Sequence, residues 1–382
     1  MGVCFQENNY SSIKIQFEKK ELLIGLKPNN KLCELNAFLQ CLCHIESLVN
    51  KIKYNFNEIK NQKIYKIFNK SEKCLTDDFK DMVDKLYPND ITIRKENVIK
   101  KIYKTEDSNK LLETIYKINP QYNENQILLI DFFLMRLHNE LKQDEDKAQQ
   151  IANIEDETNK DQVLQNYSIK SSNENMSIIN DIFFGTYYIY SICSNCKHTA
   201  YKFLPFIYNT YSLGEVYNYK VFTYNNGQNA LYMNKMINLN EINLYDCLYY
   251  DQQIKSNIYT CKKCSISTQH NFRNIIYATG QILTLVFNKN DLIPDINFLI
   301  EENIDITNLV ESKQYKIYEL IGIIFYFLPN RYLTYCKSPI DKKWYFYEDA
   351  KVEIIKNFQK ITNNNFIPYM MFYQRKVPKK NF

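Results

Sequence analysis

The spacing of apolar residues divides the chain into a helical first part and a β-rich second part. Between Leu32 and Val49 the apolar residues recur at helical intervals, and residues 127–141 form a second apolar helical pattern that ends in Leu-His-Asn-Glu-Leu. From residue 178 onward, short runs rich in β-branched and aromatic residues predict strands at 186–192, 201–208, 281–287, 318–327 and 343–347. Helices followed by strands indicate an α+β fold.

Polar segments separate and flank these two parts. Residues 142–177 are acidic, rich in Ser, Asn and Gln and low in apolar side chains, which predicts a flexible insertion. Residues 1–21, with alternating apolar positions, are expected to form an N-terminal tail or an added strand. Residues 371–382 are expected to form a basic, solvated tail.

Composition and charge exclude several classes of protein. The 382 residues carry 48 basic and 43 acidic side chains, and a net charge of +5 is too small to favour nucleic acid as a partner. No apolar run approaches the roughly 18 residues of a membrane span. We therefore expect a globular protein with neither partner.

Cysteine usage indicates an intracellular protein, in the cytoplasm or the nucleus. The chain has 11 cysteines, an odd number, and two C-x-x-C pairs, which suit a reducing compartment better than a disulfide framework. Gly2 and Cys4 offer a lipid-anchoring alternative, but Gln6 stands where the myristoylation motif has Ser or Thr.

The two C-x-x-C pairs predict a metal site. Cys193 and Cys196 form one pair and Cys261 and Cys264 the other, and each follows a predicted strand. Two such turns can surround one tetrahedral Zn, and four thiolates leave no open position, so the site would be structural. The alternative is four unligated, buried thiols.

Cys33 lies where a loop meets the first predicted helix. A helix N-terminus favours the thiolate, and Lys31 would add to this effect, so Cys33 is a candidate nucleophile. The alternative is a small core residue.

A series of motifs in fixed order resembles the ubiquitin-specific proteases. Gly25-Leu26, Cys33, Leu35-Asn36 and Leu39-Gln40 are similar to the cysteine box of that family. Residues 124–141, 182–206, 244–264 and 282–287 are similar, in order, to its second helical box, to the two flanks of its zinc-bearing fingers and to its palm strand. Residues 332–337 and 343–349 resemble its histidine box.

The resemblance implies a papain-like fold and a specific chemistry. It implies a helical thumb at 22–141, zinc-bearing β fingers that grip ubiquitin at 178–280, and a β palm at 281–370. Cys33 would attack the carbonyl that joins the C-terminus of ubiquitin to a lysine. A His would act as base, an Asp or Asn would orient it, and an Asn before the cysteine would help to hold the oxyanion.

The chain departs from this machinery at the catalytic positions. The position of the base aligns with Arg331, and the orienting position aligns with Glu348, beside Asp349. A guanidinium stays protonated and has no acceptor, so it cannot take a proton from Cys33. The oxyanion asparagine aligns with Pro28.

The other histidines offer no substitute for the missing base. The chain contains four, His44, His138, His198 and His270, and none follows residue 270. His44 lies eleven residues after Cys33, roughly 16 Å along a helix, which is too far to reach the thiol.

Three functions remain open from the sequence. The first is an inactive, ubiquitin-binding or scaffolding relative of the deubiquitinases, which Arg331 favours. The second is an active deubiquitinase that works through Cys33. The third is a structural subunit of a larger protein assembly that no longer binds ubiquitin or a ubiquitin-like protein.

Overall fold

The computed structural model describes the chain from residue 24 to residue 377 with gaps. The described residues are 24–28, 33–71, 73–87, 105–120, 122, 128–143, 157–174, 176–226, 238–288, 297–313, 316–327, 331–362 and 368–377. The tail or strand predicted at 1–21 lies outside them, as does Lys31.

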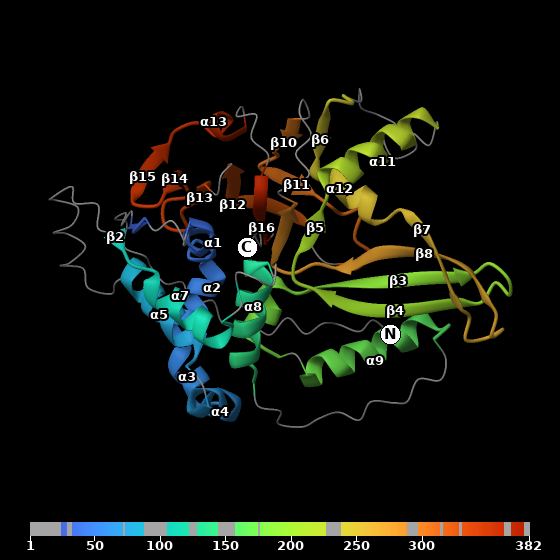
Figure 1. The fold of residues 1–382 in the computed structure, drawn as a ribbon, viewed down its shortest axis with the longest axis horizontal. Helices are drawn as coiled ribbons and strands as arrows, with labels where there is room; N and C mark the ends of the chain where they lie inside the picture. Colours follow the sequence, from blue (N-terminus) through green and yellow to red (C-terminus); the bar gives the residue numbers. More distant parts are fainter. Residues whose placement is uncertain are drawn as a thin grey trace, which may run out of the picture.

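Helices form the first lobe, which is the thumb that the resemblance implied (Figure 1). They are α1 (Cys33–Leu42), α2 (Glu46–Tyr54), α3 (Phe56–Asn61), α4 (Lys63–Ser71), α5 (Leu75–Leu86), α7 (Asn109–Ile118), α8 (Leu129–Glu140) and α10 (Ile178–Phe183). The helix predicted at 32–49 is divided between α1 and α2, and α8 confirms the second predicted helix. Two short parallel strands, β1 (Gly25–Leu26) and β2 (Thr105–Glu106), join the lobe beside α1.

The palm is a mixed sheet of eight strands. Seven follow in the order β15 (Lys351–Ile355), β14 (Trp344–Glu348), β13 (Arg331–Lys337), β12 (Ile317–Phe327), β16 (Pro368–Arg375), β9 (Ile282–Phe287) and β5 (Asn209–Tyr211), and β11 (Asn303–Asp305) pairs with β12. Along β16, Met370 and Phe372 face the thumb core, while Met371 and Tyr373 face a second core on the other side of the sheet. Both faces of the sheet are therefore covered.

The end of β16 differs from the tail predicted at 371–382. Met371, Phe372 and Tyr373 are fully buried, and the strand continues to Arg375. Because β16 lies between β12 and β9, its residues form a continuous apolar run, which is typical of a central strand. The palm thus extends beyond the expected limit at residue 370.

The second core packs the back of the palm against α11 (Leu213–Asn225) and α12 (Leu244–Asp251). The short strands β6 (Glu241–Asn243) and β10 (Asn297–Leu299) pair in parallel beside them, and α13 (Gln359–Thr362) follows β15. Among the described helices, none is long and apolar enough to cross a membrane.

The fingers are an antiparallel sheet that extends away from the palm (Figure 1). Its strand order is β4 (Thr199–Phe206), β3 (Gly185–Cys193), β8 (Ser267–Ala278) and β7 (Ile254–Thr260). The predicted strands at 186–192 and 201–208 correspond to β3 and β4.

The segment predicted as a flexible insertion contains a helix. Residues 160–174 form α9 (Lys160–Glu174), which packs on the finger sheet, whereas residues 144–156 lie outside the described residues. Most of the apolar side chains in this contact come from the fingers and few come from α9 itself. The composition of residues 142–177, which is low in apolar side chains, therefore did not indicate a packed helix.

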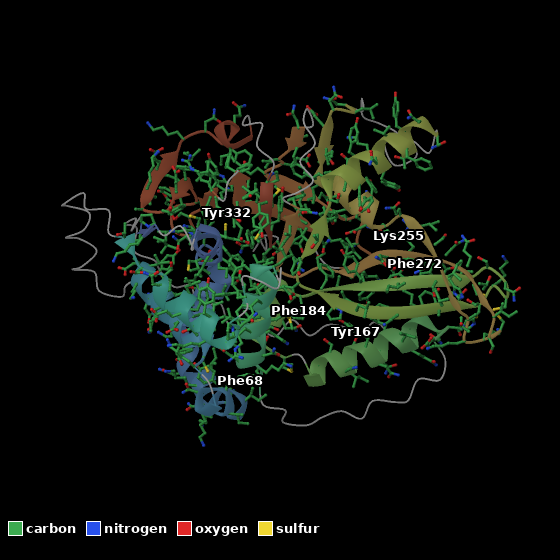
Figure 2. The ribbon with its side chains drawn as sticks, in the orientation of Figure 1. Phe68, Tyr167, Phe184, Lys255, Phe272 and Tyr332 are labelled. Atoms are coloured by element: carbon green, nitrogen blue, oxygen red, sulfur yellow. The ribbon has the colours of Figure 1, made fainter. Side chains whose placement is uncertain are left out.

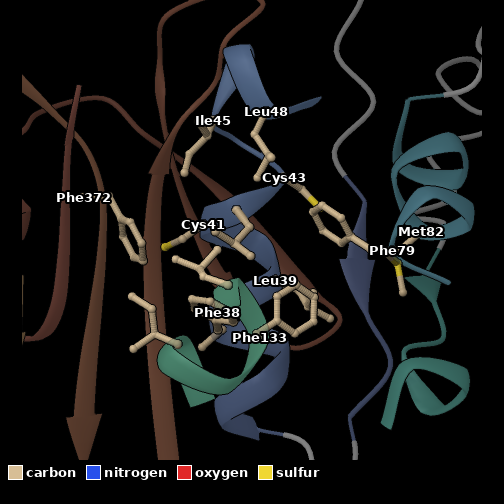
Figure 3. Close-up of a cluster of buried hydrophobic side chains, with 14 of the residues drawn as sticks. Phe38, Leu39, Cys41, Cys43, Ile45, Leu48, Phe79, Met82, Phe133 and Phe372 are labelled. Carbon is tan, nitrogen blue, oxygen red and sulfur yellow. The ribbon is translucent and has the colours of Figure 1, made fainter. Parts of the chain in front are cut away.

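Helix α1 is the centre of the thumb core (Figure 3). The Phe38 ring lies 5.5 Å from that of Phe133 and 6.4 Å from that of Phe372, so one side chain joins α8 and the palm. A Cβ added at Gly322 would lie 3.1 Å from Cys41 Sγ, so the glycine lets α1 approach β12 closely. This packing fixes the helix whose first residue is Cys33.

The Leu-His-Asn-Glu-Leu motif at the end of α8 is structural. The Glu140 carboxylate accepts hydrogen bonds from the backbone N–H groups of Leu75 and Thr76 and so caps α5. His138 Nδ1 lies 2.7 Å from Oγ of Ser177, the residue that caps α10. The motif thereby joins three thumb helices.

Candidate functional site

Polar residues on α1 hold Cys33 between the thumb and the palm. Asn36 Nδ2 donates to Asp349 Oδ1 and to the Lys27 carbonyl, at 3.0 Å each, while Ser108 Oγ donates to Asn36 Oδ1 at 2.6 Å. Sequence reasoning gave Asn36 only as part of the cysteine-box motif. The structure makes it the link between the cysteine helix and the turn after β14.

The chain before the cysteine runs tightly against that same turn. The Leu26 N–H donates to the Asp349 carbonyl at 3.0 Å, and a Cβ at Gly25 would lie 2.6 Å from that oxygen. Asp349 has a positive φ of 48°, which Asp tolerates better than most residues. A glycine at position 25 is therefore required by the close approach of two backbones at the site.

The surroundings of Cys33 oppose its ionisation. Burial is the larger cause and the negative charge of Asp349 the second, and together they raise the pKa of the thiol above its ordinary value. The backbone N–H of Cys33 itself acts in the opposite direction and is outweighed. The helix N-terminus was expected to favour the thiolate of Cys33, but burial and the neighbouring carboxylate outweigh that effect; Lys31, the other expected influence, lies outside the described residues.

A carboxylate held by two tyrosines lies directly after the cysteine. Glu34 accepts hydrogen bonds from Tyr332 Oη at 2.9 Å and from Tyr369 Oη at 2.7 Å. Burial, followed by the charge of Glu34, raises the pKa of both phenols well above the ordinary value, so both hydroxyls stay protonated and can donate to the carboxylate. Tyr332 is labelled where the palm meets the thumb in Figure 2.

The Glu34 cluster was not found from the sequence. Its partners lie 298 and 335 residues further along the chain, and no local pattern links them. The cluster ties the first turn of α1 to β13 and β16.

The predicted position of the base holds an ion pair. The Arg331 guanidinium, 63% exposed, donates to Glu348 Oε1, so the predicted base and orienting positions contact each other. The guanidinium offers donors and no acceptor, and it cannot take a proton from a thiol. Pro28, at the predicted oxyanion position, is exposed and has no N–H to donate.

All four histidines lie in other parts of the structure. His44 is buried, with Nδ1 2.6 Å from the Gln40 carbonyl and Nε2 2.9 Å from Tyr347 Oη. His138 contacts Ser177, as described above. His198 belongs to the first cysteine turn, and the His270 ring stacks on Tyr259 at 3.6 Å.

The four predicted metal ligands converge at the tip of the fingers. Their sulfur atoms all lie within 4.8 Å of one another, with Cys193 Sγ 4.0 Å from Cys264 Sγ and Cys196 Sγ 3.7 Å from Cys261 Sγ. Sulfur atoms at about 2.3 Å from a tetrahedral centre are separated by about 3.8 Å, so the spacing fits a metal ion. The four cysteines could therefore hold one.

The two cysteine turns have the same backbone geometry. Cys193 N–H donates to the carbonyl of residue 198 and Cys261 N–H to that of residue 266, and in each turn the residue after the second cysteine has a positive φ, near 57°. The Ile266 N–H and then the Asn195 amide lower the pKa of the Cys264 thiol to about 6. These hydrogen bonds favour the thiolate form of Cys264.

Comparison with known proteins places this arrangement in a family. Residues 24–373 match the family described as ubiquitin carboxyl-terminal hydrolase. No curated protein sequence matches the chain.

Solved structures of one deubiquitinating module share the fold. The SAGA DUB module Ubp8/Sgf11/Sus1/Sgf73 bound to monoubiquitin is similar at 17% identity and a TM-score of 0.57, over 92% of this chain and 69% of that chain. The same module bound to ubiquitin aldehyde is similar at 18% identity and a TM-score of 0.57, over 94% of this chain and 71% of that chain. The yeast module with a mutant Sgf73 is similar at 17% identity and a TM-score of 0.56, over 94% of this chain and 70% of that chain. Since the family match spans nearly the whole chain, the protein belongs to the ubiquitin carboxyl-terminal hydrolase family.

Proposed function

We propose that the chain binds ubiquitin, or a ubiquitin-like protein, and does not hydrolyse its conjugates. The observation that carries this proposal is the Arg331–Glu348 ion pair at the position of the base. It is supported by the raised pKa of Cys33 and by the placement of all four histidines elsewhere.

Cleavage of an isopeptide bond needs two proton transfers that these residues do not provide. The thiol must lose a proton before it attacks, and burial, followed by the negative charge of Asp349, raises the pKa of Cys33. The leaving amine must then gain a proton, and a guanidinium, with a pKa above about 12, is too weak an acid to give one near neutral pH. Loss of a catalytic-triad member costs around 10⁶ in rate in a well-studied serine protease.

The metal at the finger tip is proposed to be zinc. A closed set of four thiolates with tetrahedral spacing suits Zn, and it leaves no position for water or substrate. Its role would be to fix the ends of β3 and β7 together.

The proposed setting is a protein assembly inside the cell, in the cytoplasm or the nucleus. The similar solved structures are of a module of several proteins, two of them bound to ubiquitin or ubiquitin aldehyde. Exposed Ile254 and Ile258, each 70% accessible on the edge strand β7, offer apolar contact area for a further subunit.

Binding and cleavage should be measured on the same preparation. We expect the full chain to bind ubiquitin reversibly and to leave di-ubiquitin uncleaved. Cys33→Ala should keep the affinity for ubiquitin, because the binding surface does not depend on the thiol. Cleavage of di-ubiquitin that Cys33→Ala abolishes would instead establish an active deubiquitinase, and absence of ubiquitin binding would favour a structural subunit.

A further inference from the structure

Helix α9 covers an aromatic face of the finger sheet. Its Val163, Leu164 and Tyr167 pack there in one cluster with finger residues. The finger residues of this cluster are Tyr188, Tyr190, Tyr201, Phe203, Ile275 and Tyr277. Figure 2 labels Tyr167 between α9 and the finger strands.

Specific contacts hold the helix on this face. The Tyr167 ring lies 5.8 Å from that of Phe203, and its hydroxyl lies 3.4 Å from Thr186 Oγ1. At the start of α9, Lys160 Nζ lies 4.0 Å above the Tyr188 ring and pairs with Glu311. The Tyr188 hydroxyl donates to the same carboxylate at 2.5 Å.

The two sides of this contact are unequal. The finger face presents four tyrosines and a phenylalanine, the residue types that dominate protein-binding surfaces. The side chain of Val163 is buried, whereas Asp161, Gln162 and Gln165 are exposed. A helix of 15 residues is marginal alone in water, so α9 depends on the face more than the face depends on α9.

The segment that contains α9 leaves and rejoins the fold at a single point. The Gln143 N–H donates to the Met176 carbonyl at 2.9 Å, and the backbones of Lys142 and Ser177 form an antiparallel β-bridge. Undocking of α9 therefore does not require movement of α8 or α10.

The opposite face of the sheet is already occupied at its base. There the Tyr187 hydroxyl donates to Asp251 of α12 at 3.2 Å, and the Tyr187 ring lies 4.2 Å from that of Phe206. Undocking of α9 would therefore open an aromatic face to a partner, whereas α12 continues to cover the part of the opposite face around Tyr187.

We propose that α9 is an intramolecular competitor that occupies the protein-binding face of the fingers and must undock before ubiquitin can bind there. This inference rests on the proposed ubiquitin-binding function. The helix lowers the apparent affinity in proportion to the fraction of molecules in which it is docked. A helix docked in nine molecules of ten weakens binding about tenfold.

The test removes the helix and measures the dissociation constant for ubiquitin. Because residues 143 and 176 are hydrogen-bonded, an Asn-Gly turn can replace residues 144–175. We expect this deletion to tighten binding about tenfold. The double variant Val163→Asp, Tyr167→Ser should act in the same direction, and Gln165→Asp, at an exposed position of α9, should leave the affinity unchanged.

Each outcome decides between the two proposals. Equal or weaker binding after deletion would overturn the competitor role and leave ubiquitin binding intact. If neither protein binds ubiquitin, both proposals are wrong, whereas binding by the deletion variant alone supports both. In the full chain, ubiquitin should also speed amide hydrogen exchange across residues 160–174, and unchanged exchange would contradict displacement.

Discussion

The two cysteine sites of this protein differ in completeness. At the finger tip four thiols converge within 4.8 Å, and backbone N–H groups lower the pKa of two of them, Cys261 and Cys264. At the start of α1 the pKa of one thiol is raised by burial and by Asp349, and Arg331 stands at the predicted position of its base. Cysteine side chains are thus arranged so that they could bind a metal at the finger tip, whereas the surroundings of Cys33 oppose its ionisation.

The difference follows from how each site is built. Each cysteine turn is local, since a few consecutive residues set both its backbone hydrogen bonds and its sulfur positions. The site around Cys33 joins α1 to palm residues about 300 positions later, as the contacts of Asn36 and Glu34 show. A site assembled from distant strands loses its chemistry when one partner changes, while its structural contacts persist.

The largest effect is expected from breaking the metal site. Cys261→Ser should destabilise the fingers by about 5 kcal/mol or more, because structural zinc contributes roughly 10–16 kcal/mol in small domains. Zinc analysis and thermal unfolding would measure this. The matched change Cys33→Ser should keep one zinc per chain and an unaltered melting temperature. Purified protein with clearly less than one zinc would contradict the metal assignment.

Replacing Arg331 by histidine should supply the base that the Cys33 site lacks. Arg331→His places an imidazole beside Glu348, and general acid–base help is worth about 10² to 10⁴ in rate, or roughly 3–5 kcal/mol. Hydrolysis of a fluorogenic ubiquitin amide would measure the gain. Arg331→Gln should show none, and Cys33→Ala should remove it. An equal rate for the histidine and glutamine variants would show that more than the base is missing.

The pH dependence of stability tests whether His44 is structural. Burial lowers the pKa of His44 from 6.5 to about 4, so between these values the unfolded chain binds a proton that the folded chain does not. Its contribution to stability therefore falls as pH falls from 6.5 to 4, by about 3 kcal/mol. In denaturant unfolding experiments, the free energy of unfolding of His44→Gln should fall less steeply between pH 6.5 and pH 4 than that of the unmodified protein. If the variant and the unmodified protein lose stability equally over this pH range, other groups cause the acid sensitivity.

The smallest effect concerns the reactivity of Cys33. Asp349→Asn removes a negative charge, lowers the pKa of the thiol and so raises the thiolate fraction at pH 8. Alkylation of the Cys33 peptide, followed by mass spectrometry, should accelerate about three- to tenfold, equivalent to roughly one kcal/mol. Glu353→Gln, an exposed carboxylate on β15, serves as the charge-matched control. An unchanged rate would make burial the sole cause.

Local patterns predicted what local sequence determines. Period and composition identified α8, β3, β9 and β12, and spacing identified the four cysteines that converge. The packing of α9 escaped prediction because its partners are finger side chains. The raised pKa of Cys33 was not predicted for a related reason. Burial and the charge of Asp349 arise only in the assembled fold, whereas the start of the helix can be predicted from the sequence.

The position of β16 has a consequence for the order of folding. The last described strand of the chain lies in the middle of the palm, between β12 and β9. During synthesis both neighbours therefore expose open edges until residues 368–375 leave the ribosome, and neither core can close before then. A nascent chain stalled or truncated before Pro368 should depend on chaperones, and its two unpaired edges should make it prone to aggregation.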